Sequence, residues 1–283
     1  MKSINFFGSY SSGFQPYIIK VNSGASGEVA IPTRGVYTYD YDVRVQETSQ
    51  SFTNQTGDLT ITFPATNTDY VIEIRGVFPE YEFNNGDATN RAKMLDVIQC
   101  GDIEVLSLLG AFSSLPNCTW SATDFMNTDN CIILAYSFNN SPLINPDLSG
   151  CDLSNILTLQ HGFLSASSMD KPFIHPETSL LINISNCFQV NKIPVIELGA
   201  QSLSTFNSFS INSTYITRFI VYGMKNSFSI QRATNVVGSE IDNMFTELDT
   251  ANVGATLTVT TAQSTSGIDT TIATNKGWTI VIV

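Results

Sequence analysis

The chain has two histidines, and neither has the neighbours that catalysis or metal binding requires. No carboxylate or cysteine lies at metal-ligand spacing from His161 or His175, and Glu177 follows His175 across a proline. Ser168 and Lys171 fit an S-x-x-K pattern, but no partner motif accompanies them. Glycine-rich phosphate loops and G-x-S-x-G are absent from the sequence. We therefore interpret both histidines as loop or surface residues and predict no catalytic residue and no cofactor.

Asp40 and Asp42 are the one pair of carboxylates that strand spacing would bring together. Residues at i and i+2 of a strand point to the same face, about 7 Å apart. Such a pair can seat a calcium ion or act as two coupled carboxylates, or it can lie on a solvated polar face, which we favour. A glycan hydrolase would need two carboxylates ~5–9.5 Å apart in a cleft. No sequence feature predicts such a cleft, so we predict a protein that is not an enzyme.

Aromatic residues are concentrated in the first 14 positions. They are Phe6, Phe7, Tyr10 and Phe14, and Gly8, Ser11, Ser12 and Gly13 lie among them. A segment this short cannot fold alone. It either packs on the domain that follows or docks into a neighbouring protein as an assembly anchor.

Composition excludes several classes of protein. The 283 residues carry a net charge of −12 and only 13 Lys plus Arg, which argues against a nucleic-acid partner. Only 13% of residues are charged, so Asn, Ser and Thr must cover the surface. No apolar run reaches the ~20 residues of a membrane span, and the N-terminus lacks the apolar region of a secretory signal. The five cysteines lack C-x-x-C spacing, and we expect free, mostly buried thiols.

A repeated triplet organises the middle of the chain. Apolar residues precede a phenylalanine by seven and four positions, a spacing that favours one stripe of a helix. The first four phenylalanines are 26, 25 and 25 residues apart, and a small residue precedes each. The pattern predicts a solenoid in which one helix per unit packs closely on the next. The triplets are Val105, Leu108 and Phe112; Cys131, Leu134 and Phe138; Ile156, Leu159 and Phe163; Leu181, Ile184 and Phe188; and, more weakly, Ser202, Thr205 and Phe209; Val221, Met224 and Phe228; Gly238, Ile241 and Phe245.

The remaining patterns divide the chain into an N-terminal arm (1–14), a β module (15–84), a junction (85–104), the solenoid (105–253) and a cap (254–283). Period-two alternation predicts strands at 17–21, 28–31, 36–45, 59–63 and 70–78, which favours an antiparallel sandwich of immunoglobulin type. A strand at 93–98 would lead into the solenoid. The cap reads as a strand at 255–261, a helix at 267–275 ended by Gly277, and a strand at 278–283. The expected fold is mixed α and β.

Three segments carry a resemblance to known proteins: 56–64 (TGDLTITFP), 70–79 (YVIEIRGVFP) and 93–103 (KMLDVIQCGDI). With the repeat and the ending 275–280 (NKGWTI), they resemble BspA-like surface proteins, in which a PKD-like domain precedes irregular leucine-rich repeats. This chain lacks the Trp-Gly-Asp-Gly turn usual in the PKD-like pattern, and Cys100 stands where relatives often have Trp. The resemblance implies a bacterial surface adhesin or a phage tail or virion protein.

These observations together predict a non-enzymatic virion surface or tail protein of a phage that mediates host attachment. The expected partners are other virion proteins, a host cell-surface glycan or protein, and further copies of the chain. Two alternatives stay open: a bacterial cell-surface adhesin, and a structural capsid or tail decoration protein without receptor binding. The sequence does not single out receptor-binding residues.

Overall fold

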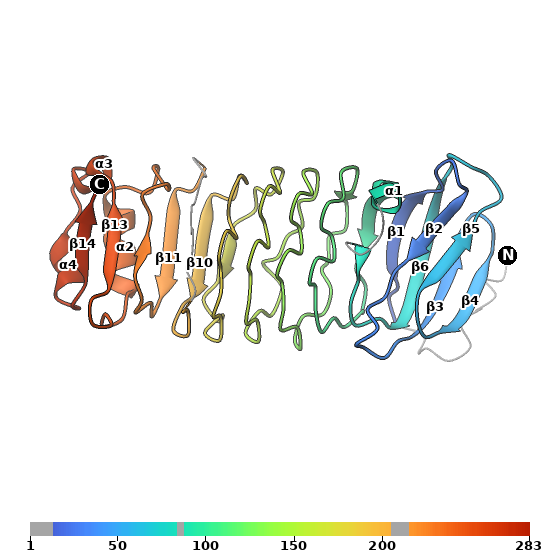
Figure 1. Cartoon of the computed structure of the whole chain (residues 1–283), viewed down its shortest axis with the longest axis horizontal. Helices are drawn as coiled ribbons and strands as arrows, with labels where there is room; N and C mark the ends of the chain where they lie inside the picture. Colours follow the sequence, from blue (N-terminus) through green and yellow to red (C-terminus); the bar gives the residue numbers. More distant parts are fainter. Residues whose placement is uncertain (1–13, 84–87, 205–214) are drawn as a thin grey trace.

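The protein is an elongated, mostly β rod in which successive turns of chain are stacked along the long axis (Figure 1). The structure is a computed structural model and describes residues 14–83, 88–204 and 215–283. The N-terminal module forms one end of the rod, and a β-solenoid of parallel coils forms the rest. Helices are few and short, so the expected mixture of α and β is corrected to a mainly β protein.

The N-terminal module contains two sheets. The larger sheet has the order β4-β3-β6-β1-β7-β8, in which all pairs are antiparallel except the parallel pair β7 and β8. A separate antiparallel pair, β2 and β5, contributes Val29, Ile31 and Ile61 to the core. Whether this is an immunoglobulin-type sandwich stays a prediction. The strands are β1 (Tyr17–Asn22), β2 (Glu28–Ile31), β3 (Asp40–Val45), β4 (Ser51–Gln55), β5 (Leu59–Thr62), β6 (Asp69–Val77), β7 (Met94–Gln99) and β8 (Thr119–Trp120), and the helix α1 (Ala88–Lys93) precedes β7.

The first solenoid coils are held by a backbone ladder and contain turns instead of helices. Every second amide of residues 108–114 donates to a carbonyl 25 residues later, as from Leu108 to Ile133 (2.9 Å). The next two coils repeat this ladder with an offset of 24 residues, as from Phe138 to Gly162 (2.8 Å) and from Phe163 to Cys187 (3.1 Å). The predicted helix in each of these units is therefore wrong.

Left-handed residues explain why turns replace the helices. The residue two before each of the first four phenylalanines has positive φ, and so does the residue two after it. Positive φ is what the third residue of a type II turn requires, and a helix cannot contain it. The eight positions are Gly110, Tyr136, His161 and Asn186 before the ring, and Ser114, Asn140, Ser165 and Val190 after it.

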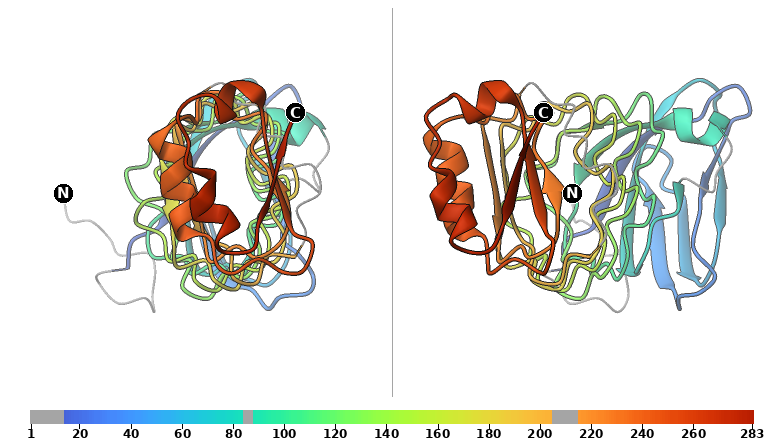
Figure 2. Two further views of the ribbon diagram at one scale, coloured as in Figure 1. Left: turned by 90° about the vertical axis from the view of Figure 1, so that its left-hand side faces the viewer. Right: turned by 60° about the vertical axis from the view of Figure 1, so that its left-hand side comes forward.

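Parallel strands form other faces of the coils. β9 (Phe173–His175), β10 (Val195–Gly199) and β11 (Arg218–Tyr222) make one sheet, and β12 (Phe228–Ser229), β13 (Thr256–Val259) and β14 (Thr279–Ile282) make another. Near the C-terminus the coils do contain helices: α2 (Ser239–Glu247), α3 (Thr261–Ser264) and α4 (Thr270–Thr274). Seen along the rod, α2 and α4 lie on one side and β14 on the other (Figure 2).

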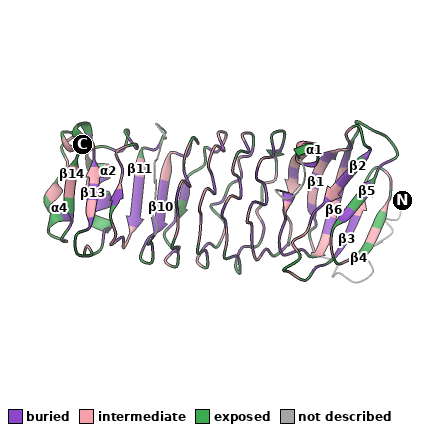
Figure 3. Cartoon of the chain, in the orientation of Figure 1, coloured by how far each residue is buried: buried purple, intermediate pink, exposed green. Residues whose placement is uncertain are grey.

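One hydrophobic core runs through both the N-terminal module and the solenoid (Figure 3). Its centre is a stack of aromatic rings that crosses the junction. Centroids are 5.3 Å apart for Phe83 and Tyr81, 6.1 Å for Tyr81 and Phe112, and 5.7 Å for Phe112 and Phe138. The stack continues with 5.8 Å from Phe138 to Phe163 and 5.4 Å from Phe163 to Phe188.

Candidate functional site

The Asp42 carboxylate supports the backbone of the N-terminal sheet. It is 8% exposed, and its Oδ1 accepts a hydrogen bond from the amide of Asn54 at 2.8 Å. Between Tyr41 and Val43 the register of β3 with β4 shifts, and Asn54 has a positive φ of 53°. The carboxylate thus replaces the ladder partner that this β-bulge removes. Asp40 is exposed on the same strand. Within the described residues, no three His, Cys, Asp or Glu side chains come together in a way that would hold a metal ion.

The two histidines are more buried than expected. His175 lies on β9 with 2% exposure, and its Nδ1 is 2.8 Å from Glu177 Oε1. His161 is half-buried, packs against Tyr136 (centroids 4.6 Å apart), and its Nε2 is 2.9 Å from Asn186 Nδ2. Burial lowers the pKa of His161, so its ring is neutral near pH 7. The interpretation of His175 as a loop or surface residue is wrong, because its ring points into the solenoid.

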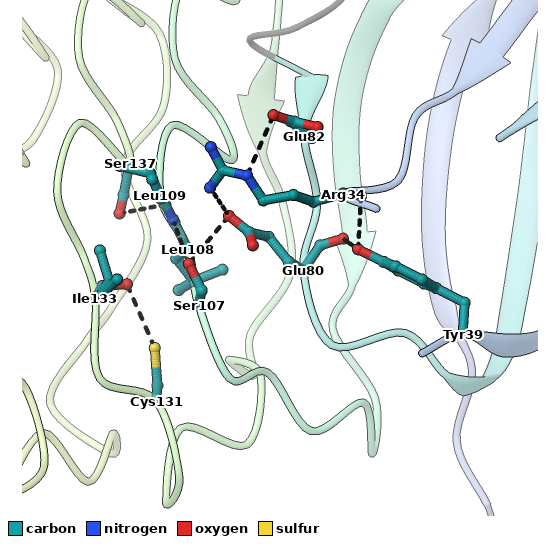
Figure 4. Close-up of polar contacts among 10 residues, drawn as sticks. All are labelled: Arg34, Tyr39, Glu80, Glu82, Ser107, Leu108, Leu109, Cys131, Ile133 and Ser137. Carbon is teal, nitrogen blue, oxygen red and sulfur yellow. Dashed lines mark hydrogen bonds and ion pairs between the residues drawn. The ribbon is translucent and has the colours of Figure 1, made fainter. Parts of the chain in front are cut away.

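A buried carboxylate network joins the N-terminal module to the first coil (Figure 4). Glu80 is fully buried, and its Oε1 accepts from Arg34 Nη1 at 2.8 Å and from Ser107 Oγ at 3.0 Å. Arg34 Nε also lies 3.4 Å from Glu82 Oε1. The Tyr39 hydroxyl donates to the Glu80 carbonyl at 3.0 Å and accepts from the Arg34 amide at 2.8 Å. Because solvent does not reach Glu80, the network orients the junction and is inaccessible to a substrate.

The predicted repeat-core residues in the described segments are all buried. They are Leu108, Phe112, Leu134, Phe138, Leu159, Phe163, Ile184, Phe188, Phe228 and Phe245. Phe228 lies on β12 with its ring 5.6 Å from that of Trp278, and Phe245 lies on α2. Phe209 and three residues of the possible assembly anchor, Phe6, Phe7 and Tyr10, lie outside the described residues.

Four of the five cysteines lie in the interior. All five cysteines are free, and only Cys151 is not fully buried. Burial raises the pKa of the Cys131 and Cys151 thiols to about 12, so neither supplies a thiolate near neutral pH. At the junction the amides of Cys100 and Gly101 donate to the two oxygens of Asp124, at 2.9 and 2.7 Å. Cys100 therefore occupies a fully buried, hydrogen-bonded position.

The candidate binding site is a groove of about 310 Å³ between the edge strand β11 and the helix α2. Residues at i, i+2 and i+4 of β11 share one face, which places Arg218, Ile220 and Tyr222 along one wall. The other wall is the exposed side of α2, whose Ile241, Met244 and Phe245 point into the core. Its groove residues are Asn243, Thr246 and Glu247.

Glu197 of the neighbouring strand β10 holds the strand wall in place. Glu197 is the register partner of Ile220 on β11. Arg218 and Tyr222 lie two residues before and two residues after Ile220 on that strand. Its Oε1 is 2.7 Å from Arg218 Nε, and its Oε2 accepts from the Tyr222 hydroxyl at 2.7 Å. Burial, with the Glu197 carboxylate beside it, raises the pKa of Tyr222 to about 12. The hydroxyl therefore stays protonated and donates throughout the physiological range.

The groove presents donors and acceptors side by side. Arg218 offers guanidinium N–H groups, Asn243 offers an amide, Thr246 a hydroxyl and Glu247 a carboxylate. Both oxygens of Glu197 are engaged, which leaves that residue to position its neighbours. Sequence reasoning missed the groove because its residues come from different coils. The only local signal was the run 218–222, in which the polar residues Arg218 and Tyr222 flank three consecutive apolar residues.

Comparisons with known proteins add no relative to this description. No family model, curated protein or solved structure matches the chain. Among the described helices, none has the length and apolar character needed to cross a bilayer.

Proposed function

We propose that the chain is a non-enzymatic attachment protein on the surface or tail of a phage virion, and that the groove between β11 and α2 binds a host cell-surface glycan. The observation that carries the proposal is the fixed polar wall of Glu197, Arg218 and Tyr222 facing the polar side of α2. Saccharide hydroxyls both donate and accept hydrogen bonds, and this groove offers partners for both. Preorganised side chains lower the entropy lost on binding.

The architecture supports an attachment role. A single core with stacked rings makes the rod continuous from the N-terminal module to the last coil. A groove near one end of such a rod is held at a fixed distance from the other end, where a particle would hold the protein. The regular coil offset of 24 or 25 residues is consistent with the resemblance to BspA-like repeats. That family assignment and the virion location are parts of the proposal.

A glycan microarray probed with the full chain tests the groove. We expect Tyr222→Ala and Arg218→Ala each to weaken binding at least tenfold, because each removes a polar contact and releases Glu197. Tyr37→Ala, which removes a partly exposed ring from the N-terminal module, is the matched control and should bind like wild type. Equal binding by wild type and both groove variants would disprove the site.

Attachment and decoration are separated by binding to intact cells. If the isolated protein adheres to bacteria and a recognised glycan competes, attachment is supported. A chain that binds no glycan and no cell, yet associates with particles that lack it, would instead be a decoration protein. A secretion signal upstream in the genomic reading frame would favour the bacterial adhesin.

A further inference from the structure

The two hydroxyl groups of the groove between β11 and α2 direct their hydrogens away from a ligand. The Tyr222 hydroxyl donates to Glu197 Oε2 at 2.7 Å. The Thr246 hydroxyl donates to the backbone carbonyl of Asp242 at 2.9 Å. A hydroxyl oxygen that donates its hydrogen still has lone pairs that can accept a hydrogen bond. Both groove hydroxyls are therefore left as acceptors for a ligand.

The Glu247 carboxylate is a third acceptor in the groove. It is exposed, and among the described residues no hydrogen bond or ion pair engages its side chain. Residues at i, i+3 and i+4 of a helix lie on one face, so Asn243, Thr246 and Glu247 project from the same side of α2. An ionised carboxylate accepts hydrogen bonds and donates none. The helix wall thus presents a free, charged acceptor beside the Thr246 oxygen.

The groove also carries an excess of negative charge. Arg218 is the only basic residue among the described residues that line it. Its guanidinium is already paired, because Nε lies 2.7 Å from Glu197 Oε1 and Nη1 lies 3.9 Å from Glu240 Oε2. The positive charge of Arg218 is therefore shared by two other carboxylates, and the charge of Glu247 stays unbalanced.

Glu247 occupies a position where a helix favours the opposite charge. It is the last residue of α2, and the carbonyls at a helix C-terminus carry a partial negative charge that attracts cations. The last turn of α2 contains no basic residue. Lys276 of the following coil donates to the carbonyls of Phe245, Thr246 and Leu248. A carboxylate at this end of α2 is unfavourable in the empty groove, and a bound cation would offset that cost.

We propose that the groove selects glycans with a free primary ammonium group, the class of unacetylated amino sugars, and that Glu247 determines this specificity. An ammonium has three N–H donors and no acceptor, which matches the free oxygens of Tyr222, Thr246 and Glu247. The outer guanidinium N–H groups of Arg218 and the amide of Asn243 serve the oxygens of the sugar hydroxyls. This inference rests on the proposed function, because it names the ligand class of the same groove.

Two tetrasaccharides that differ only in acetylation test the specificity. The full chain is titrated calorimetrically with a tetramer of glucosamine and with its fully N-acetylated counterpart, at mildly acidic pH so that the amines are protonated. Acetylation removes the charge and leaves a single N–H. We expect wild type to bind the glucosamine tetramer at least tenfold more tightly, because charge-assisted hydrogen bonds are roughly twice as strong as neutral ones. Glu247→Gln should bring the two affinities to within about twofold of each other.

Glu104→Gln is the matched control. It removes an exposed carboxylate from a distant coil and changes the net charge of the chain by the same amount. A chain with a net charge of −12 attracts cations over its whole surface, and this variant measures that contribution. It should keep the wild-type preference, and circular dichroism should show that both variants are folded. A preference that survives Glu247→Gln, or that both variants lose equally, would contradict the role of Glu247.

The remaining outcomes separate this inference from the proposed function. If wild type binds both tetramers equally, or binds only neutral glycans on the microarray, and Tyr222→Ala abolishes that binding, the groove is a glycan site without ammonium specificity. The inference then fails and the proposed function stands. If wild type binds no glycan of either kind, the proposed function fails and this inference fails with it.

Discussion

The small residues before two of the stacked phenylalanines, Ser137 and Gly162, lie against backbone carbonyls. Ser137 Oγ donates to the carbonyls of Leu108 and Leu134, both at 2.8 Å, so one hydroxyl joins two coils. At the same position in the next coil, a Cβ on Gly162 would lie 3.0 Å from the Leu159 carbonyl and 3.1 Å from that of Leu134. Small side chains are thus required for coils of turns to stack, where the sequence analysis attributed them to helix packing.

Removing a ring from the stack should cost more than removing a ring beside it. Phe138 is fully buried between the rings of Phe112 and Phe163. Phe138→Ala should lower the free energy of unfolding by roughly 3–5 kcal/mol, because a large cavity is left. Phe125→Ala is the matched control, since Phe125 is only partly buried. Urea denaturation measures both; a loss for Phe138→Ala no larger than the control's would contradict the stacking.

Burial of Glu80 should make stability depend on pH in a defined direction. Burial raises the pKa of this carboxyl above its ordinary value of 4.5, although Arg34 and Ser107 oppose the shift. A raised folded-state pKa means that the folded chain holds the proton longer, so this group's contribution falls as pH rises through the raised value. Below about pH 4.5 the group is protonated in both states and imposes no such cost.

Comparison with a neutral side chain isolates this effect. The unfolding free energy of wild type minus that of Glu80→Gln should be highest near pH 4.5 and should decline towards pH 8. Glu104→Gln, which removes an exposed carboxylate, is the control and should show a flatter difference. Urea denaturation across this pH range is the measurement. A difference for Glu80→Gln that rises with pH would show that the Arg34 ion pair outweighs burial.

At the scale of the elements, the left-handed turn positions contain one residue that is poorly suited to them. Ser114, Asn140 and Ser165 are followed in the fourth coil by Val190, at a φ of 56°. A β-branched side chain at positive φ is strained, whereas Asn tolerates this region. Val190→Asn should therefore stabilise the protein by about 1 kcal/mol, or roughly 2–4 °C in melting temperature.

The control for this prediction is a valine without positive φ. Val36 is 77% exposed, and Val36→Asn should leave the melting temperature within about 1 °C of wild type by the usual behaviour of surface substitutions. Differential scanning calorimetry compares the two variants with wild type. If Val190→Asn melts at or below the wild-type temperature, contacts of the valine outweigh the relief of strain.

A buried glutamine organises the last coils. Gln263 is fully buried, and its Nε2 donates to the carbonyls of Ile230, Ala233 and Val236 at 3.2, 3.0 and 3.3 Å. Its Oε1 accepts from the Thr260 amide at 2.9 Å. Gln263→Leu should lower stability by about 2–3 kcal/mol, because buried polar groups lose their partners. The exposed Gln201→Leu should change it by less than about 0.5 kcal/mol. Equal effects on urea denaturation would contradict this role.

The sequence predicted which side chains point inward better than it predicted the backbone that places them. The spacing of Leu134 and Phe138 predicts that both side chains point inward. This holds whether the backbone between them forms a helix or a run of turns. The turns differ from a helix in the positive φ of Tyr136 and His161, and tyrosine and histidine are residue types that do not indicate a turn. In the cap, residues 256–259, 270–274 and 279–282 do follow the predicted strand, helix and strand, because local propensity and capping agree there. The groove depends on register between distant coils, which one sequence does not reveal.

For the whole molecule, the shared core should couple the two ends of the rod. The chain has two tryptophans. Trp120 packs on Phe112 and Phe138 near the N-terminal module. Trp278 is only 2% exposed and lies in the cap beside Phe228. Trp120→Phe and Trp278→Phe each leave one fluorescent reporter. Solenoid stability is the sum of repeat and interface terms, and here the N-terminal module shares an interface with the first coil through Tyr81 and Phe112.

We therefore expect coincident unfolding. In each single-tryptophan variant, the urea midpoint from fluorescence should equal the midpoint from circular dichroism of the same variant, because neither end has a core of its own. Comparison within one variant removes any stability change caused by the substitution itself. A fluorescence midpoint that departs from the dichroism midpoint at only one end would mean that the stack is interrupted energetically. The rod would then consist of separately stable segments, and the groove would no longer be held rigidly relative to the N-terminal module.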